Sequence, residues 1–436
     1  MTATTTPACA NSVVTPAAPS GPALKTYIAV FLVALLARGG WGLVRNAGAG
    51  ETAALEFPDE RQYWLMASSL RAGEGLKDEF GFRASRMPLY PGALSLVPQS
   101  PRGIFIARVA LWVMGALAAV LAAATASSMF GIYVGLVAGI LVALDPFLIF
   151  FSSLLLTETP TVVATLALWC VCVPIVNRPK RDVSALRWGA VGIASALCVY
   201  VRESCLGLVV LLVVTICICR GFERRTLLGV CVVIMIVVAA LFPWALRNKR
   251  VTGQWCWLTS RAGVSLYDGV GPQADGSSNL AEIQSAFNKT DAKSRSEMQW
   301  NRYLLSESAR MIRDDPGRIA RLAVVKWLRT WSPVPNVASY QSALVRAVSL
   351  LWTIPIFALA IAGAALLPRI RNDGGVRAAF FLLLPALYIS AVHAVFVGSV
   401  RYRIAAVPAL EILAAVAVFA LIRCGLGRRP VWGPGD

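Results

Sequence analysis

The sequence is poor in charged residues and contains a single histidine. Charged side chains make up 15% of its 436 residues, whereas an ordinary soluble domain has about 25%. Hydrophobic residues make up 57%, and this composition excludes a soluble enzyme. Because His393 is the only histidine, a histidine-rich metal site is excluded as well.

The ten cysteines do not follow the pattern of a disulfide framework or a zinc site. Most lie inside apolar runs, where cysteine behaves as a small hydrophobic residue. The pairs Cys170/Cys172 and Cys217/Cys219 have neither a second ligand pair nor a nearby histidine, so we expect no metal there. The first 25 residues lack the basic start of a signal peptide and indicate a disordered tail.

Long apolar runs dominate the rest of the chain. Ten of them reach or approach the length of about 20 residues that crosses a bilayer: 26–44, 104–126, 131–146, 157–176, 187–201, 204–219, 226–244, 344–367, 378–397 and 404–422. The sequence therefore predicts an all-α polytopic integral membrane protein with about ten transmembrane helices. No internal repeat is visible, which disfavours the inverted-repeat architecture of many transporters.

The positive charge is large but is placed in short loops. A formal net charge of +18 would suggest nucleic acid as the partner of a soluble chain. Here Lys and Arg gather between the apolar runs, at 178–181, 220–225, 369–371 and 428–429. This is the positive-inside pattern, so we expect contact with membrane lipids, no nucleic-acid partner, and both termini in the cytoplasm.

That orientation divides the chain into five parts. Residues 1–25 and 423–436 are cytoplasmic tails, 26–244 form a transmembrane core that includes a first outer loop at 45–103, 245–343 form a second outer loop, and 344–422 hold the last transmembrane helices. The expected location is the cytoplasmic (inner) membrane, with the long loops facing the exterior.

Both outer loops contain helical patterns. In the first loop, Tyr63, Met66 and Leu70 recur at helical spacing after Pro58, which predicts a helix on the membrane surface. Gly73 and Gly75 end it, and 88–92 indicate a second turn. In the second loop, 294–313 and 317–331 are typical of amphipathic helices, and Trp300, Trp327 and Trp331 suit an interfacial position.

Asp59 and Glu60 are the most informative pair of polar residues. They begin the predicted surface helix just outside the first span, at the height of lipid headgroups. A carboxylate there can act as a general base. Alternatively, Asp59 simply caps the helix that begins at Glu60.

Several motifs together resemble the GT-C glycosyltransferases, and most closely their bacterial protein-mannosyltransferase-like and aminoarabinose-transferase-like group. The motifs are 57–67, 73–75, 86–91, 156–159, 243–248, 401–403 and Pro408. Each alone is weak, but their order and spacing cover about residues 50–420, and all are expected at one membrane face. The resemblance implies a GT-C fold, a polyprenyl-phosphate-linked sugar donor, and transfer to a glycan, lipid or protein acceptor on the outer side.

The resemblance implies that Asp59 is the catalytic carboxylate, with Glu60 beside it. A donor phosphate needs cationic partners, and arginine suits bidentate contact with phosphate. The arginines expected near the outer helix ends are Arg61, Arg86, Arg202, Arg247, Arg401 and Arg403. For each of them, snorkelling to the membrane interface is the alternative.

Glu158 and Glu203 are the other acids that we expect near the substrate. Arg202 and Glu203 interrupt a long apolar stretch, where ionisable groups are usually paired or functional. A structural ion pair of Arg202 with either acid is the alternative, and Glu158 could simply favour the start of its helix. Tyr63, Tyr90 and Tyr402 could bond sugar or phosphate or form an interfacial belt.

Three functions remain open at this point. The leading hypothesis is a polyprenyl-phosphate-sugar-dependent hexosyl- or pentosyltransferase, while a flippase for lipid-linked sugars and an O-antigen polymerase or ligase are the alternatives. A flippase would not need Asp59 at the membrane surface. No cofactor is certain; a divalent cation at the donor phosphate would have to rely on carboxylates, and we expect no metal site.

Overall fold

The computed structural model describes residues 21–48, 55–177, 182–289, 295–371 and 373–426. Its helices are α1 (Gly21–Gly48), α2 (Pro58–Arg71), α3 (Leu89–Leu94), α4 (Pro101–Phe130), α5 (Ile132–Leu144), α6 (Pro146–Phe151), α7 (Glu158–Asn177), α8 (Ala185–Val201), α9 (Cys205–Arg220), α10 (Arg224–Thr252), α11 (Ala262–Val270), α12 (Leu280–Lys289), α13 (Glu297–Asp314), α14 (Pro316–Thr330), α15 (Ala343–Arg371), α16 (Asp373–Val395), α17 (Val400–Arg403) and α18 (Val407–Gly425). These described residues contain no strand, which confirms the all-α prediction.

Each of the ten predicted spans coincides with a helix. Seven of these helices are long and apolar enough to cross a membrane: α1, α4, α7, α10, α15, α16 and α18. The helices α5, α8 and α9 are shorter, with 13, 17 and 16 residues. At 1.5 Å per residue, α5 covers roughly 20 Å, less than the apolar thickness of a bilayer. The number of ten spans therefore stays a prediction.

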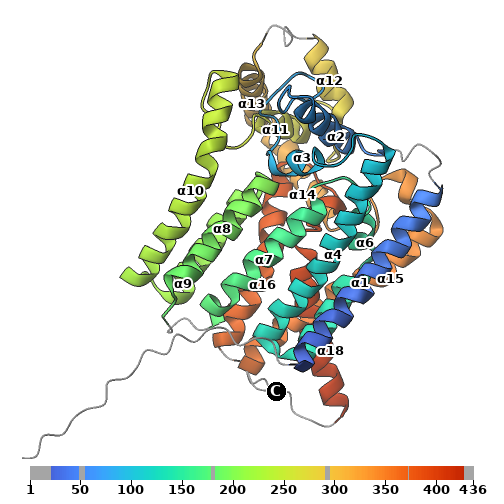
Figure 1. Cartoon of the computed structure of the whole chain (residues 1–436), viewed down its shortest axis with the longest axis vertical. Helices are drawn as coiled ribbons and strands as arrows, with labels where there is room; N and C mark the ends of the chain where they lie inside the picture. The colour runs from blue at the N-terminus through green and yellow to red at the C-terminus, as the bar shows by residue number, and fades with distance from the viewer. Residues whose placement is uncertain (1–20, 49–54, 178–181, 290–294, 372, 427–436) are drawn as a thin grey trace, which may run out of the picture.

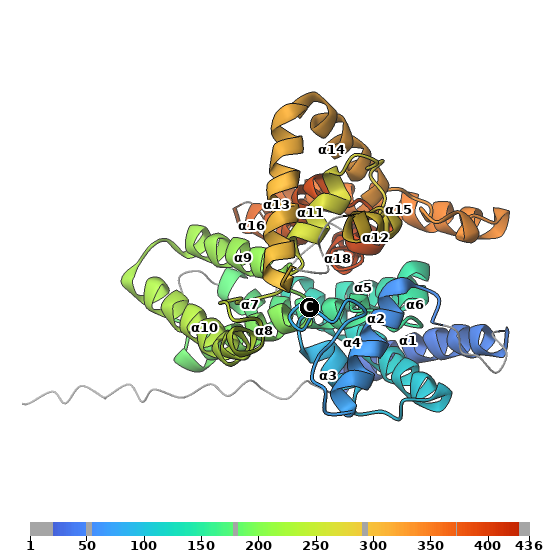
Figure 2. The same cartoon turned by 90° about the horizontal axis from the view of Figure 1, so that it is seen from above.

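The long helices run side by side as one bundle, and both long loops lie at the same end of it (Figure 1). The cap at that end consists of α2, α3, α11, α12 and α13. Seen from above, α13 and α14 lie on the side of α16 and α18, while α2 and α3 lie on the side of α4 (Figure 2). The shared location of the two loops agrees with the predicted topology.

Glycine and proline set the boundaries that bring the chain back to the cap. Gly131, with φ of 93°, separates α4 from α5 because few other residues adopt that backbone conformation. Asp145 caps α6 by accepting the Leu148 amide at 2.7 Å, and Pro146 occupies the first helical position, where its missing N–H costs nothing.

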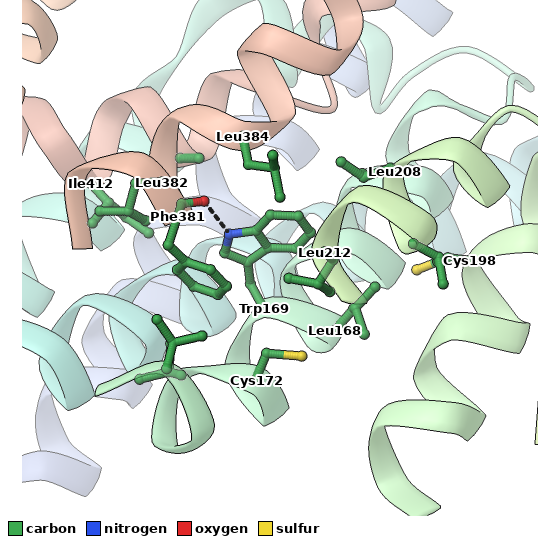
Figure 3. Packing of buried hydrophobic residues seen from close by; sticks show 14 of the residues in the cluster. Leu168, Trp169, Cys172, Cys198, Leu208, Leu212, Phe381, Leu382, Leu384 and Ile412 are labelled. Atoms are coloured by element: carbon green, nitrogen blue, oxygen red, sulfur yellow. Dashed lines mark hydrogen bonds between the residues drawn. The ribbon is translucent and has the colours of Figure 1, made fainter. Parts of the chain in front are cut away.

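The largest core lies among α7, α8, α9, α16 and α18. Trp169 is its centre: the indole stacks on Phe381 with 5.3 Å between ring centroids, and its Nε1 donates to the Phe381 carbonyl at 3.2 Å (Figure 3). The opposite faces of these helices are apolar and exposed, for example at Ile218 of α9 and Leu387 of α16. Apolar faces of this kind require lipid rather than water around them.

Arg38 ties the first span to the rest of the bundle. Its buried guanidinium donates to the carbonyls of Val142 and Ala143 at 3.0 and 2.9 Å. Those carbonyls belong to the last turn of α5, where no further helical amide is available to bond them. Sequence analysis did not single out this contact.

Four details of the sequence analysis need correction. The helix α1 already begins at Gly21, inside the expected tail, and the remainder of both tails lies mostly outside the described residues. Residues 89–94 form α3 instead of a turn. Trp300 is buried against Phe287 and Leu304 inside the cap, so it is not interfacial. The helix predicted after Pro58 is confirmed as α2, but Tyr63 and Met66 are buried in protein, and its position on the membrane surface stays a prediction.

Candidate active site

The candidate site lies where the cap meets the ends of the spans. Five elements contribute to it: α2, the loop before α3, the start of α7, the break between α8 and α9, and α17. The break exists because α8 ends at Val201, the backbone of the next residue, Arg202, is extended with φ of −153°, and α9 starts only at Cys205. Polar residues at this break therefore sit at the end of the bundle, as expected from the interrupted apolar stretch.

Arg401 joins the two principal carboxylates. Its Nη1 donates to Oδ2 of Asp59 at 2.5 Å, and its Nε donates to Oε1 of Glu158 at 2.5 Å. Arg86 holds the other oxygen of Asp59, with 2.5 Å between Nη2 and Oδ1. The Asp59 carboxylate is thus gripped on both oxygens by arginines from two distant parts of the chain.

The two arginines control the proton affinity of Asp59. Burial by itself raises the pKa of this carboxyl, but the positive charges of Arg401 and Arg86 outweigh it and hold the pKa well below its usual range. Asp59 is consequently a carboxylate at any physiological pH. While both arginines hold it, it is also a weak base.

Glu158 lies deeper than Asp59 and is 2% exposed. Besides Arg401, it is approached by Arg202 at 3.3 Å between Nη1 and Oε1, so the expected alternative of an Arg202–Glu158 ion pair is present. The described residues offer no hydrogen-bond partner to its second oxygen. Arg202 also lies over the ring of Tyr402, 5.3 Å from its centroid, and Tyr402 stacks on His393.

Tyr63 and Tyr90 form the wall next to Arg86. The guanidinium of Arg86 lies 5.0 Å from the centroid of the Tyr63 ring. Tyr90 meets that ring edge to face at 5.1 Å. The buried Tyr90 hydroxyl has no hydrogen-bond partner among the described residues, and such a group favours a ligand that supplies one.

Glu60 has a structural position instead of the catalytic one expected for it. Its side chain is fully buried. Oε2 accepts the amides of Glu56 and Phe57 at 2.9 and 3.0 Å, and Oε1 accepts the Leu155 amide at 2.8 Å. Glu60 therefore fastens α2 to the segment before α7, and Asp59 is the member of the pair that joins the arginines of the candidate site.

Three expected arginines also face elsewhere. Arg61 is exposed and donates to the Leu55 carbonyl. Arg247 bonds the Arg83 carbonyl and Asn248, which fastens the end of α10 to the first loop. Arg403 is buried between aromatic rings and donates to the Ser332 carbonyl. No contact of these arginines with Asp59 or Glu158 is present in the described part of the chain.

Sequence analysis missed Gln62 and Arg261. Gln62 lies one turn after Asp59 on the same face of α2, and its Oε1 accepts from Arg86 at 2.7 Å and from Arg261 at 3.3 Å. Arg261 precedes α11 and adds another positive charge next to Asp59. The helical spacing could have indicated Gln62, but Arg261 is placed only by tertiary structure.

Glu203 and Asp268 add negative charge at longer range. Glu203 interacts electrostatically with Arg86 and Arg261. Asp268 interacts in the same way with Arg261 and Asp59, but its oxygens are engaged by Ser278 and the Asn279 amide. The directly joined centre therefore contains two carboxylates and three arginines, with Arg261 beside them.

The carboxylates do not fit a divalent cation. No group of three or more His, Cys, Asp or Glu side chains that could hold a metal ion is found in the described ranges. Asp59 and Glu158 already share the guanidinium of Arg401, which occupies the bridging place of a cation. Bringing a metal ion between them would require Arg401 to leave.

No family model matches the sequence, and no curated protein matches it. Among solved structures, the archaeal oligosaccharyltransferase AglB from Archaeoglobus fulgidus, in complex with an inhibitory peptide and a dolichol-phosphate, is similar with a TM-score of 0.58 and 14% identity, over 94% of this chain and 52% of that one. ArnT from Cupriavidus metallidurans, bound to undecaprenyl phosphate, is similar with a TM-score of 0.51 and 16% identity, over 94% and 62%.

Both similar proteins are GT-C membrane glycosyltransferases. At this identity the likeness shows the fold, so the chain has the GT-C fold that its motifs predicted and is a multi-pass membrane protein. The chain spans only about half to three fifths of the length of these two proteins.

Proposed function

We propose that this GT-C-fold chain is a glycosyltransferase that takes a sugar from a polyprenyl-phosphate donor and transfers it to an acceptor hydroxyl on the outer face of the cytoplasmic membrane. The observation that carries the proposal is the arginine-bound Asp59 at the junction of the cap and the bundle. The fold supports it, because its similar structures contain a dolichol-phosphate and undecaprenyl phosphate.

The charges around Asp59 suit a donor with a phosphate leaving group. Arg86, Arg202, Arg261 and Arg401 converge on two directly contacted carboxylates. Arginines in such excess can accept a phosphate through charge-assisted hydrogen bonds. A phosphate that leaves the sugar gains negative charge, so the same contacts strengthen as the bond breaks.

Binding of the donor also activates Asp59. Arginines that turn toward the phosphate loosen their hold on the Asp59 carboxylate, and its proton affinity then rises toward that of an ordinary carboxyl. In the transfer step, the acceptor oxygen forms a bond to the anomeric carbon, the bond from that carbon to the phosphate oxygen breaks, and the acceptor proton passes to Asp59. The phosphate keeps the bonding electrons, so charges and atoms balance.

The test is sugar transfer in membranes that contain wild type or Asp59→Asn. Radiolabelled polyprenyl-phosphate sugars are supplied, and label is followed into free sugar, lipid, polysaccharide and protein. We expect incorporation with wild type and none with the variant at equal protein level. Equal labelling with both, or movement of intact donor across the bilayer without transfer, would support the flippase alternative and refute the proposal.

A further inference from the structure

A pocket leads away from Asp59 into the cap. Its inner end is formed by Asp59, Gln62 and Arg261. A second hollow shares several of its lining residues, among them Phe80 and Phe82, and continues outward past Asn288 and Arg295. We call the two together the outer pocket. It connects the candidate catalytic carboxylate with the surface of the cap.

The outer pocket is built from the cap alone. Its lining residues come from α2, the loop 78–85, residues 260–264, α12, the start of α13 and Arg295. None belongs to a helix that is long and apolar enough to span the membrane. A molecule that reaches Asp59 by this route therefore arrives from water, whereas a lipid-borne molecule reaches it between the spans.

One wall of the outer pocket consists of aromatic rings. Phe287 lies at its centre, with ring centroids of Phe80, Phe82 and Trp300 at 4.9, 6.1 and 5.5 Å. Trp300 is buried beneath, but Phe80 and Phe82 remain half-buried and present ring surface to the hollow. Aromatic ring faces of this kind bind the C–H face of a sugar ring. That face is apolar, whereas the hydroxyl groups at the edge of the sugar ring are polar.

The outer pocket is lined by five uncharged polar residues and by three acids and two arginines whose charges nearly cancel: Gln62, Ser85, Ser260, Gln284 and Asn288, with Asp59, Asp78, Glu79, Arg261 and Arg295. Gln284 and Asn288 carry amides that both donate and accept, and Gln284 donates to Asn288 at 3.2 Å. The amide of Gln62 is engaged by Glu79, which accepts from it at 2.8 Å. Hydroxyl groups also donate and accept, so they match this set on both counts. Aromatic faces combined with a few convergent amides are the features of a small-molecule pocket.

We propose that the outer pocket is the acceptor subsite and that the acceptor is a neutral glycan end delivered from water. The sugar ring stacks on Phe80 and Phe82, its hydroxyls bond the amides, and one hydroxyl projects to Asp59. This proposal rests on the proposed function and narrows its acceptor to carbohydrate.

Binding of glycans tests the subsite without requiring transfer. The full-length protein in nanodiscs is titrated with mannotriose, maltotriose, galactotriose and arabinotriose, and binding is followed by saturation-transfer NMR. We expect at least one trisaccharide to bind wild type, and its affinity to fall about tenfold in Phe82→Ala. Gln284→Ala, a change at an exposed position that leaves the core intact, should weaken binding in the same direction.

The matched control is Phe222→Ala. Phe222 is exposed in the loop between α9 and α10, at the opposite end of the bundle (Figure 1), and this variant should bind like wild type. Absence of binding of all four trisaccharides to wild type would overturn the subsite. Affinities of Phe82→Ala and Gln284→Ala that both equal the wild-type affinity would overturn it as well.

Transfer assays separate the two proposals. With a bound trisaccharide as acceptor, we expect the acceptor KM to rise about tenfold in Phe82→Ala, and the donor KM to stay near that of wild type. Glycan binding without transfer from any donor would refute the proposed function and leave the subsite. Transfer into lipid or protein but not into glycan would refute the subsite and leave the proposed function.

Discussion

Asp59 and Arg401 are separated by 342 residues in the chain and are joined by an ion pair of 2.5 Å. Asp59 begins the first helix of the cap, and Arg401 lies in the short helix that precedes the last span. This ion pair therefore joins an N-terminal and a C-terminal segment of the chain within the candidate site. Because Arg401 also holds the buried Glu158, the geometry of the site depends on this one guanidinium.

Asp59→Asn should abolish transfer, because the amide cannot accept the acceptor's proton. A general base typically contributes about 10²- to 10⁴-fold to the rate, so the remaining rate should fall by at least that order. The protein level in membranes should stay unchanged. Asp182→Asn, which alters an exposed carboxylate paired with Arg225, is the control and should retain full transfer.

Arg401→Lys should lower kcat/KM for the donor strongly, because lysine presents one point charge instead of a planar fork and cannot bridge Asp59 and Glu158. A loss of about 100-fold is expected. Arg313→Lys, at an exposed position on α13, serves as the matched control. Full activity of Arg401→Lys would show that charge alone suffices and would contradict the bridging role.

The acid limit of activity should depend on Arg86. The arginines hold the pKa of Asp59 below its usual range. The carboxylate therefore stays ionised when the pH falls through about 4, the ordinary pKa of an aspartate. The stability that the ionised carboxylate contributes persists over the same range. That contribution is lost only at still lower pH. In Arg86→Gln one of the two cations is missing, so the acid limb of the pH–rate profile should move upward. An unchanged limb would argue against this coupling.

Glu60→Ala should destabilise the protein, which distinguishes Glu60 from Asp59. The change leaves the buried amides of Glu56, Phe57 and Leu155 without their acceptor, and each such loss costs about 1–3 kcal/mol. We expect a lower thermal midpoint in detergent and less protein in the membrane. An active variant of normal stability would contradict the structural role.

Lys326 should make stability rise with pH in the alkaline range. Burial lowers the pKa of this lysine, which donates to the Val395 carbonyl, to about 8. Between that value and the ordinary pKa of about 10.4, the unfolded chain binds more protons than the folded one, so the free energy of unfolding increases with pH. The thermal midpoint of wild type should rise over this interval, and that rise should vanish in Lys326→Met.

The sequence predicted the helical bundle well because a helix that crosses a membrane requires a long apolar run, which is visible in the sequence. Every apolar run corresponds to a helix, and the amphipathic pattern of 294–313 and 317–331 corresponds to α13 and α14. The helices α11 and α12 were not predicted; they have only 9 and 10 residues. The interior position of Trp300 depends on how those helices fold over it, which no local pattern records.

The candidate site was predicted in part. Motif order brought Asp59, Arg86, Glu158, Arg202 and Arg401 to one membrane face, and the structure brings these residues together. The order of the motifs could not indicate which of two adjacent residues faces the site. One position along a helix turns a side chain by about 100°, which is why Glu60 and Arg61 point away from the pocket that Asp59 faces.

The position of Arg401 has a consequence for the newly made protein. Chains are synthesised from the N-terminus, so Asp59 and Glu158, with their partners Arg86 and Arg202, emerge long before the guanidinium of Arg401 that bridges the two acids. Until α17 is in place, these two acids face one another without their shared cation, and α18 must still be inserted to fix it. A chain that ends before α17 therefore lacks the bridge between Asp59 and Glu158, and we expect transfer only after α17 and the following helix α18 have been made.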